Sequence, residues 1–402
     1  FQSTSMRKKG RSVCLQCFLC VLGVIVILLA AYEFSVISML DVNAEVLNKS
    51  SLRDPMVPSV RKSTHSVTLV VASDLSQIEK LNFAVVAWMD EISVAVSILP
   101  KELEFYEDVL RDLHFPSRVH VSTLKTKGYW FPINELRNIA IEASTTTHIF
   151  VSDADILPSS NLRETFLSLP NFMLRDTNHA LIVPLIEAPF RSILCSHWYE
   201  CLSETETYTR LSKRDITWCL RFGGCKNLGN KGFNKYSDLW WENLPIRNQS
   251  TPLFCWDNIY QEPLLIVAKT SQLPKFNPSF VDYGYNRVEW VSHLRLSGYR
   301  FSVLSHAWAF HLTHDPSFYA LRSKEKSDPT RGKRGGVDTA KMYEKALKKY
   351  ESETTGRNQI PLCSSLVNIV TNSENPGVRR RKRITRNRKS KKIGRASCRE
   401  RV

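Results

Sequence analysis

The chain has 402 residues, and its 43% hydrophobic and 23% charged content indicates a globular protein with a sizeable core, which excludes wholesale disorder. The formal net charge of +16 lies at the two ends, because residues 1–12 and 379–402 together carry 17 basic residues and one acidic residue. The remaining 38 basic and 38 acidic residues balance, so the body of the chain gives no reason to expect a nucleic-acid partner.

A 20-residue apolar segment at 13–32 follows the basic residues 7–11. Its length is sufficient to cross a bilayer core of about 30 Å. It also exceeds the apolar stretch of about 7 to 15 residues that is usual in a cleaved signal peptide, so the sequence favours a retained signal anchor. Because basic flanks stay in the cytosol, we expect type II topology with a cytosolic tail at 1–12 and the remainder in the lumen.

The parts that follow the anchor differ in composition. Residues 33–66 are polar and contain two prolines, which indicates a stem, and residues 67–350 have the composition of a folded domain. Residues 351–402 form a basic tail, of which 393–402 (IGRASCRERV) can be back-translated into a sequencing adapter and are expected to be an artefact.

Cysteines and glycosylation sequons fit a lumenal location. Outside the anchor and the tail there are six cysteines, for which an oxidising lumen predicts disulfides and whose spacing lacks the CxxC pairs of a zinc site. The spacing does not fix the pairing. Sequons at Asn48 and Asn248 predict N-linked glycans. The six cysteines are Cys195, Cys201, Cys219, Cys225, Cys255 and Cys363.

Apolar runs with strand and helix periods alternate along the region 67–350. Such alternation predicts one α/β domain with a mostly parallel sheet flanked by helices, and a ligand site beyond the carboxyl ends of the strands. A Gly- and Asn-rich loop is expected at 222–234. The expected strands are 67–72, 94–99, 119–124, 148–152, 180–186, 264–268 and 301–304. The expected helices are 77–89, 102–113, 133–143, 204–211, 288–296 and 341–350.

Two aspartates close the apolar strand at 148–152. With a period of two, Asp153 and Asp155 would face the same side and approach one hard cation. Carboxylates suit Mg²⁺ or Mn²⁺, and such an ion can neutralise a departing nucleotide diphosphate. The alternative is an ordinary polar turn after a strand. The position at the carboxyl end of the strand favours metal binding.

Three further segments, 133–143, 280–290 and 307–316, carry candidate residues. The helix at 133–143 places Asn134, Arg137 and Asn138 close to one face, so that Arg137 either reaches a nucleotide donor or is an ordinary exposed arginine. Residues 280–290 (FVDYGYNRVEW), with Gly284 and Asn286, form either a wall for a sugar ring or a packed turn.

A histidine pair lies further along the chain, in 307–316 (AWAFHLTHDP). His311 and His314 are either structural residues of the core or a source of one imidazole ligand for the same ion.

The string FPINELRNIAIEASTTTHIFVSDADILP resembles the core of the LARGE-type glycosyltransferases, and QEPLLIVAK, FVDYGYNRV and SHAWAFHLTHDPS follow in the family's order. The resemblance spans about residues 67–350. It implies a Rossmann-like GT-A fold, Mn²⁺ (or Mg²⁺), a UDP-sugar donor and an inverting transfer.

Carried over to this chain, the resemblance implies a metal site at Asp153, Asp155 and His311, with His314 matching only some members of the family. It also implies that Glu262 binds the acceptor or acts as the general base. Asp282, which stands where LARGE has glycine, and Glu289 are rivals for the base. The residues expected to bind the donor are Asn134, Arg137, Asn138, Asp153, Gly284 and Asn286.

The sequence therefore predicts a single-pass Golgi membrane enzyme that transfers glucuronate, in preference to xylose, from a UDP-sugar to a glycan or glycoprotein acceptor. Two other classes remain open. One is a catalytically inactive GT-A protein that binds carbohydrate or serves as a scaffold. The other is a membrane-tethered polyanion binder, which rests only on the terminal charges.

Overall fold

The computed structural model describes eleven stretches of the chain. Among the helices within them, none combines the length and the apolarity that a membrane span requires. The predicted anchor at 13–32, both sequons, Cys195, Cys201 and His314 lie outside the described residues. The described residues are 64–127, 130–191, 202–222, 224–227, 241, 244, 249–256, 258–282, 284–313, 338–354 and 359–363.

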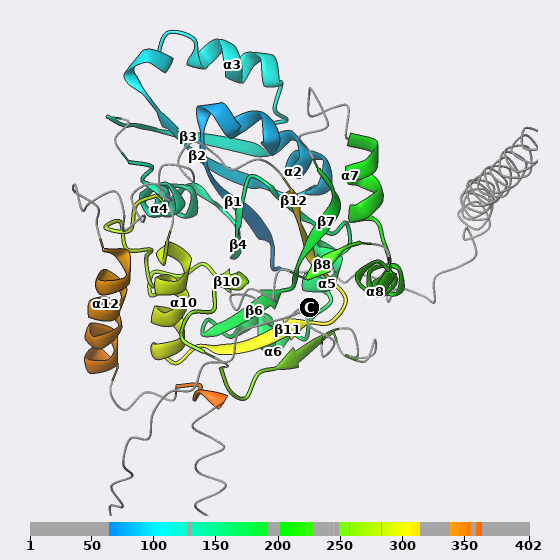
Figure 1. Cartoon of the computed structure of the whole chain (residues 1–402), viewed down its shortest axis with the longest axis vertical. Helices are drawn as coiled ribbons and strands as arrows, with labels where there is room; N and C mark the ends of the chain where they lie inside the picture. Colours follow the sequence, from blue (N-terminus) through cyan, green and yellow to red (C-terminus); the bar gives the residue numbers. More distant parts are fainter. Residues whose placement is uncertain are drawn as a thin grey trace, which may run out of the picture. The chain divides into compact units, whose positions relative to one another are not determined.

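An eight-stranded sheet in the order β3-β2-β1-β4-β10-β6-β11-β9 organises the domain (Figure 1). Its first four strands are parallel, as predicted, and their carboxyl ends share one edge. These strands are β1 (Val67–Asp74), β2 (Ile92–Ile98), β3 (Val119–Lys125) and β4 (His148–Asp153).

The second half of this sheet is mixed. β10 (Leu264–Ala268) runs antiparallel to both β4 and β6 (His179–Val183). β11 (Arg300–Leu304) is parallel to β6, and β9 (Ser250–Pro252) is antiparallel to β11. The expectation of a mostly parallel sheet is therefore correct only for the first half.

A second sheet of four strands, in the order β5-β12-β7-β8, stands beside the end of β4. The expected strand 180–186 is in fact two strands that divide at Pro184, which has no N–H to donate to a ladder. β6 stays in the large sheet, and β7 joins the small one. The small sheet comprises β5 (Ile156–Pro158), β12 (Ala309–Thr313), β7 (Leu185–Arg191) and β8 (Lys226–Asn227).

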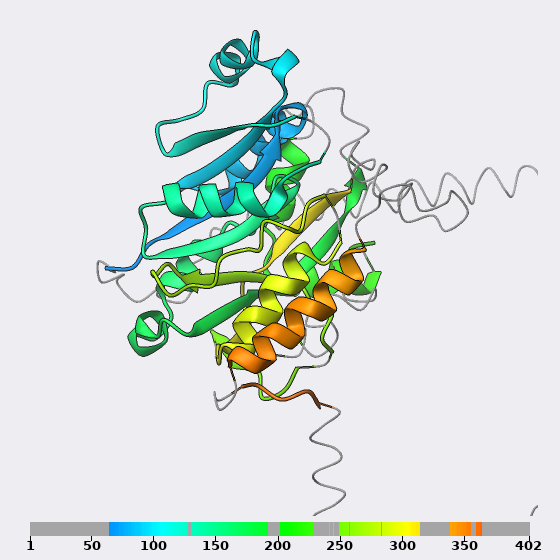
Figure 2. The same cartoon turned by 90° about the vertical axis from the view of Figure 1, so that its left-hand side faces the viewer.

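Helices cover the large sheet. α4 (Ile133–Ala143), whose bounds match the prediction, packs against β1 and β2. α10 (Asn286–Leu296) and α12 (Thr339–Glu353) pack together on the same side as α4 (Figure 2). The expected helix 77–89 is a 3-10 turn at Leu75–Lys80 followed by α2 (Leu81–Ala87).

Other helices connect the strands. α3 (Tyr106–Leu113) and α7 (Leu202–Thr209) lie where helices were expected. Three helices escaped prediction: α5 (Leu162–Leu167), α6 (Asn171–Arg175) and α8 (Lys213–Phe222).

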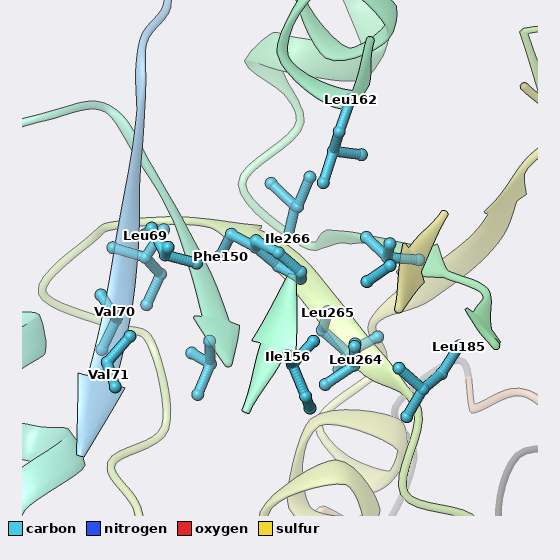
Figure 3. Packing of buried hydrophobic residues seen from close by; sticks show 14 of the residues in the cluster. Leu69, Val70, Val71, Phe150, Ile156, Leu162, Leu185, Leu264, Leu265 and Ile266 are labelled. Atoms are coloured by element: carbon cyan, nitrogen blue, oxygen red, sulfur yellow. The ribbon is translucent and has the colours of Figure 1, made fainter. Parts of the chain in front are cut away.

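The core follows from strands that are apolar on both faces, as in β10, all five residues of which are buried. Leu69 of β1, Phe150 of β4 and Ile266 of β10 meet between the layers, and Ile156 and Leu185 extend the packing to the small sheet (Figure 3). Each such side chain contributes about 1.5 to 3 kcal/mol when fully buried, so the two sheets are held as one apolar unit at the carboxyl end of β4.

His148 begins β4 and is an imidazole within the core. It is 5% exposed, and its ring meets Phe166 edge-on at 4.9 Å between centroids. Burial, helped by the charge of His65, lowers the pKa of His148 from 6.5 to about 4. The pKa of His148 is lower in the folded protein than in the unfolded chain. Its contribution to the free energy of unfolding is therefore complete above pH 6.5 and is lost as the pH falls through 4.

We therefore expect the free energy of unfolding to fall by about 3 kcal/mol on this account between pH 7 and pH 4, measured by urea denaturation. His148→Gln should flatten that dependence, because glutamine does not titrate. The exposed His120 provides the matched control, since His120→Gln should retain the acid loss. An unchanged pH profile in His148→Gln would contradict this account.

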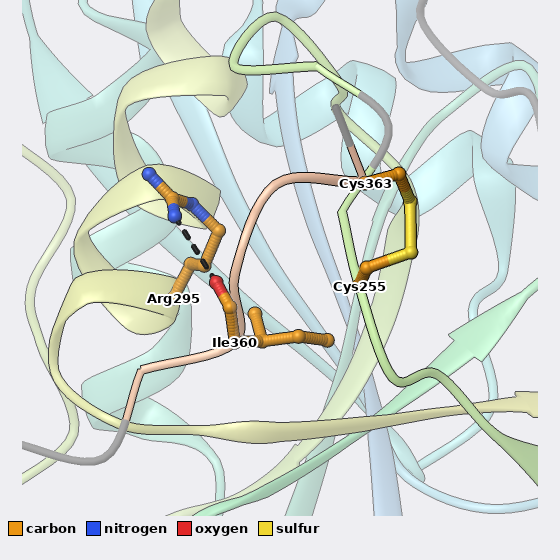
Figure 4. Close-up of a disulfide and its surroundings, with 4 residues drawn as sticks. All are labelled: Cys255, Arg295, Ile360 and Cys363. Carbon is orange, nitrogen blue, oxygen red and sulfur yellow. Dashed lines mark hydrogen bonds between the residues drawn. A yellow bond between two sulfur atoms is a disulfide. The ribbon is translucent and has the colours of Figure 1, made fainter. Parts of the chain in front are cut away.

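The four cysteines within the described residues form two disulfides. Cys219 pairs with Cys225 over a separation of 6 residues, and Cys255 pairs with Cys363 over 108 (Figure 4). The segment that carries Cys363 is also tied to α10, where the Arg295 guanidinium donates to the Ile360 carbonyl at 3.3 Å.

The longer loop should contribute more to stability, because a cross-link removes more entropy from the unfolded chain when it closes more residues. Replacing Cys255 and Cys363 by serine should lower the free energy of unfolding by about 4 to 5 kcal/mol, against about 2 kcal/mol for the same change at Cys219 and Cys225. Urea denaturation of the two double variants checks the order, and equal losses would contradict it.

Candidate active site

The site forms where β4 leaves the large sheet. Asp153 is the last residue of β4, and the chain then turns through Ala154 and Asp155 into β5 of the small sheet. The two predicted aspartates therefore lie on the link between the sheets, at the carboxyl end of a central parallel strand, where ligands of such sheets bind.

Asp155 meets His311 because β5 and β12 are antiparallel neighbours with Ile156 opposite His311. The Leu312 N–H donates to the Asp155 carbonyl at 2.9 Å, which fixes the register. Phe310 and Leu312 point into the core, so the alternation of the strand turns His311 to the other face. Its Nε2 lies 3.3 Å from Oδ2 of Asp155.

Asp153 instead accepts hydrogen bonds from two buried arginines. Nη2 of Arg137 lies 3.0 Å from Oδ1, and Nη2 of Arg287 lies 2.6 Å from Oδ2. Burial raises the pKa of Asp153, but the charges of Arg287 and Arg137 outweigh burial and hold this pKa below its usual value. The carboxylate is thus ionised and shared between α4 and α10.

Arg137 is held by more than one partner. Its Nη1 donates to Oδ1 of Asn134 at 3.1 Å and to Oδ1 of Asn286 at 3.2 Å, and its guanidinium lies 5.2 Å from the centre of the Phe276 ring. The residue is 1% exposed. In the structure, Arg137, which was expected to contact a donor, is buried and holds the Asp153 carboxylate in position.

Other residues expected to bind the donor hold loops in place. The Asn138 amide donates to the Phe276 carbonyl at 2.8 Å and accepts from the Phe276 N–H at 3.0 Å. The Asn134 amide donates to the carbonyls of Asn277, at 3.0 Å, and Asn286, at 3.2 Å. These contacts fix the loop that enters α10 against α4.

The expected sugar wall at 280–290 connects the starts of the same two helices. The Asp282 carboxylate accepts from the Phe131 N–H at 2.6 Å, and the Asp282 N–H donates to the Phe131 carbonyl at 2.8 Å. Asn286 donates to the Asp282 carbonyl at 2.9 Å. Gly284 is exposed and has a φ of +108°, which L-residues with side chains rarely adopt.

Among the three carboxylates considered as a general base, Glu262 lies in the site. It is half-buried beside the charges of Arg287, Asp153 and Arg137, and burial raises its pKa against the opposing effect of the arginines. Glu289 lies elsewhere, buried on α10, where it accepts a hydrogen bond from the Tyr350 hydroxyl of α12. Asp282 is bound to Phe131 as described above.

Sequence reasoning missed two residues of the site. Arg287 stands in a segment that was recognised, but no local pattern distinguished it from its neighbours. Glu187 of β7 lies opposite His311. The sequence did not indicate this neighbour, because it did not show that the chain passes to the second sheet at Pro184. Burial lowers the pKa of His311, but Asp155, through its hydrogen bond and charge, and Glu187 outweigh burial and raise it above the usual value.

The donor atoms fit part of the expected metal site. Asp155 and His311 offer a carboxylate and an imidazole 3.3 Å apart, a separation at which two ligands can contact one ion at about 2.1 Å each. Within the described residues, no three His, Cys, Asp or Glu side chains form a metal-binding group. Both oxygens of Asp153 face arginines, so the three-ligand site with Asp153 stays a prediction.

Comparison with solved structures gives weak likenesses. The chain resembles a crystal structure of GalNAc-T7 with UDP, GalNAc and Mn²⁺ (TM-score 0.41, 10% identity, 73% of this chain and 57% of that one). It also resembles the crystal structure of S. aureus TarS 1–349 in complex with UDP-GlcNAc (TM-score 0.35, 9% identity, 71% of each chain).

Comparison of sequences is more informative. Residues 115–193 and 231–334 match the model of the family described as glycosyl-transferase for dystroglycan. Xylosyl- and glucuronyltransferase LARGE1 of Gallus gallus and of Homo sapiens are each 28% identical over 261 residues, which is 63% of this chain and 32% of the relative. LARGE2 of Rattus norvegicus is 26% identical over 273 residues, or 66% and 37%.

The chain thus spans about a third of the length of these relatives. The family match covers the link that carries Asp153 and Asp155, the residues around Glu262, and β12 with His311. These findings confirm the predicted resemblance of this chain to the LARGE-type glycosyltransferases.

Proposed function

We propose that this chain is an inverting glycosyltransferase of the GT-A fold that transfers glucuronate from a UDP-sugar to a glycan or glycoprotein acceptor. One observation carries the proposal. Asp155 meets His311 at the carboxyl end of β4, beside a carboxylate that two arginines hold in place, within a segment that matches the family. The relatives are xylosyl- and glucuronyltransferases, which supports glucuronate or xylose as the transferred sugar.

The charges of the site favour a divalent cation. The carboxylates of Asp153, Asp155, Glu187 and Glu262 outnumber the two guanidinium groups near His311. Asp155 and His311 would hold Mn²⁺ or Mg²⁺. When bound, the ion supplies positive charge that stabilises the departing diphosphate.

Glu262 is our assignment for the general base. In an inverting displacement, the acceptor hydroxyl oxygen bonds to the anomeric carbon while the bond from that carbon to the diphosphate breaks. The hydroxyl proton must pass to a nearby group, and a carboxylate with a raised pKa accepts it more readily near neutral pH. The charges of Arg287 and Arg137 lower this pKa and partly offset the effect of burial.

The setting that we propose is the Golgi lumen, with the domain at 67–350 carried on a single type II anchor at 13–32. The basic residues before that segment support this topology. The two disulfides support an oxidising compartment, because such bonds are rare in the cytosol.

A catalytically inactive carbohydrate-binding protein is the second candidate. The observation in its favour is that both oxygens of Asp153 are paired with arginines and do not join Asp155 and His311. Such a protein would keep the fold and the sugar contacts without turning over a donor.

A panel of UDP-sugars with and without Mn²⁺ tests the two candidates. We expect Mn²⁺-dependent turnover that is fastest with UDP-glucuronate, is abolished by EDTA and is restored by added Mn²⁺. Asp155→Asn should lower kcat at least about a hundredfold, because it removes a group that stabilises the departing charge. The product should have the anomeric configuration opposite to that of the donor, as read by NMR.

Glu262→Gln gives the matched control for the panel. It should lose transfer to an acceptor while retaining Mn²⁺-dependent binding of UDP, since the amide keeps the shape but accepts no proton. If the well-folded wild-type protein consumes no donor in the panel, the enzymatic proposal fails and the inactive candidate stands.

Asp153 should prove more important for folding than Asp155. Asp153→Asn leaves two buried guanidinium groups without their counter-charge, so we expect the free energy of unfolding to fall by about 3 kcal/mol. Asp155→Asn should cost about 1 kcal/mol, the value of a single hydrogen bond. Urea denaturation of both variants measures the difference, and equal stability of Asp153→Asn and wild type would refute the structural role.

A further inference from the structure

One face of α8 presents aromatic and cationic side chains to solvent. Trp218 is 61% exposed and Phe222 is 74% exposed, and their ring centroids lie 6.1 Å apart. Arg214 and Arg221 are exposed on the same helix. At 100° per residue, these four positions fall within an arc of about 100°, so they form one face, which we call the α8 face.

The one acidic residue of α8 lies at the edge of this face and is engaged within the helix. The Asp215 carboxylate turns back to the start of the helix, where it accepts hydrogen bonds from the Ser212 N–H at 2.9 Å and from the Ser212 hydroxyl at 2.6 Å. Ile216 and Cys219 point into the protein. The α8 face therefore combines two rings with two cations.

The start of α8 is anchored to the strand that carries His311. The Lys213 ammonium donates to the Leu244 carbonyl at 2.9 Å and lies 4.8 Å from the centre of the Trp241 ring. Trp241 in turn packs edge-on against Trp308, which immediately precedes β12. This end of the helix is thus held by the core.

The end of α8 is anchored to the neighbouring strand. The Cys219–Cys225 disulfide joins the helix to the residue before β8. In the small sheet, Lys226 of β8 lies opposite Glu187 of β7, which lies opposite His311 of β12. Since neighbouring strands are about 4.8 Å apart, β8 lies about 10 Å from His311, and the disulfide ties α8 to the residue that precedes β8 (α8 and β8 are labelled in Figure 1).

The α8 face also lies outside the part of the chain that the family shares. The family model matches residues 115–193 and 231–334, and α8 with its disulfide falls in the interval between them. The helix therefore lies in an interval of this chain that the family model does not match, between the two matched segments that carry the candidate site.

We propose that the α8 face binds the acceptor, and that the acceptor is an oligosaccharide bearing carboxylates; this inference rests on the proposed function. Exposed aromatic rings offer a flat apolar surface to the C–H face of a sugar ring. The guanidinium groups of Arg214 and Arg221 match a sugar carboxylate in charge and in planar shape. A glycan whose end lies at His311 would extend across the small sheet toward β8, the strand beside the disulfide that holds α8.

Two other occupants fit this face less well. A helix that lies on a membrane buries a broad apolar stripe, whereas here two rings alternate with two cations. A second copy of the chain would have to bring negative charge to the cations, and the body of the chain is neutral.

Calorimetry with two hexasaccharides of equal length tests the proposal without requiring catalysis. One is a hyaluronan hexasaccharide, which alternates glucuronate with N-acetylglucosamine, and the other is the uncharged chitin hexasaccharide. Wild-type protein should bind the acidic one more tightly, and added salt should reduce that preference. Trp218→Ala with Phe222→Ala should weaken binding about tenfold. Arg214→Glu should remove the preference for the acidic sugar.

Phe172→Ala is the matched control, because Phe172 of α6 is 75% exposed and lies outside the α8 face. It should bind both sugars as wild type does. Unaltered binding by the Trp218→Ala, Phe222→Ala variant would overturn the proposal, as would failure of the wild type to bind the acidic sugar. Loss of self-association or of binding to phosphatidylserine vesicles in that variant, with sugar binding intact, would assign the face to another occupant and overturn it too.

Turnover of UDP-sugars by the wild type, measured separately, keeps the two proposals distinguishable. Turnover together with unaltered sugar binding in the Trp218→Ala, Phe222→Ala variant would reject the α8 face but keep the enzyme. Sugar binding that depends on α8, in a protein that turns over no donor, would keep the α8 face as a glycan site and reject only the catalytic role.

Discussion

The carboxylate of Asp153, held between Arg137 and Arg287, is the contact on which the site depends. Removing two guanidinium groups from water is expensive, and only a counter-charge with well-directed hydrogen bonds offsets the cost. Because one arginine comes from α4 and the other from α10, the same carboxylate fixes both helices at the end of β4. The polar residues around it, among them Asn134 and Asn286, are arranged to satisfy these arginines.

This arrangement divides the two aspartates of the motif between two tasks. Asp153 faces the helices that cover the large sheet, whereas Asp155 lies past the turn and faces His311 in the small sheet. Two residues apart in sequence, they are held by different layers of the fold. The separation places a carboxylate and an imidazole beside a cluster that contains two guanidinium groups, an arrangement that suits the nucleotide diphosphate and the metal that we propose.

The sequence predicted what depends on local pattern. The bounds of α4 and β10 follow from their apolar periodicity, and the aspartates were placed correctly at a strand end. The features that the sequence did not predict depend on tertiary contacts. The short strand β5 has too few residues to show a period, and the break at Pro184 became visible only with the second sheet. Whether Arg137 faces a ligand or a carboxylate depends on α10, which lies some 150 residues further along the chain.

The residues that we assign to the donor and those that we assign to the acceptor lie in different parts of the chain. The groups that would handle the donor stand on β4, β12 and α10, inside the segments that match the family. The α8 face stands in the interval that the family model leaves unmatched, yet a disulfide and the Lys213–Trp241 contact hold it rigidly to the same small sheet. A helix fixed in this way can vary its exposed residues without disturbing Asp153 or His311. If the proposed function holds, the acceptor contact that we assign to the α8 face is independent of the groups assigned to the donor.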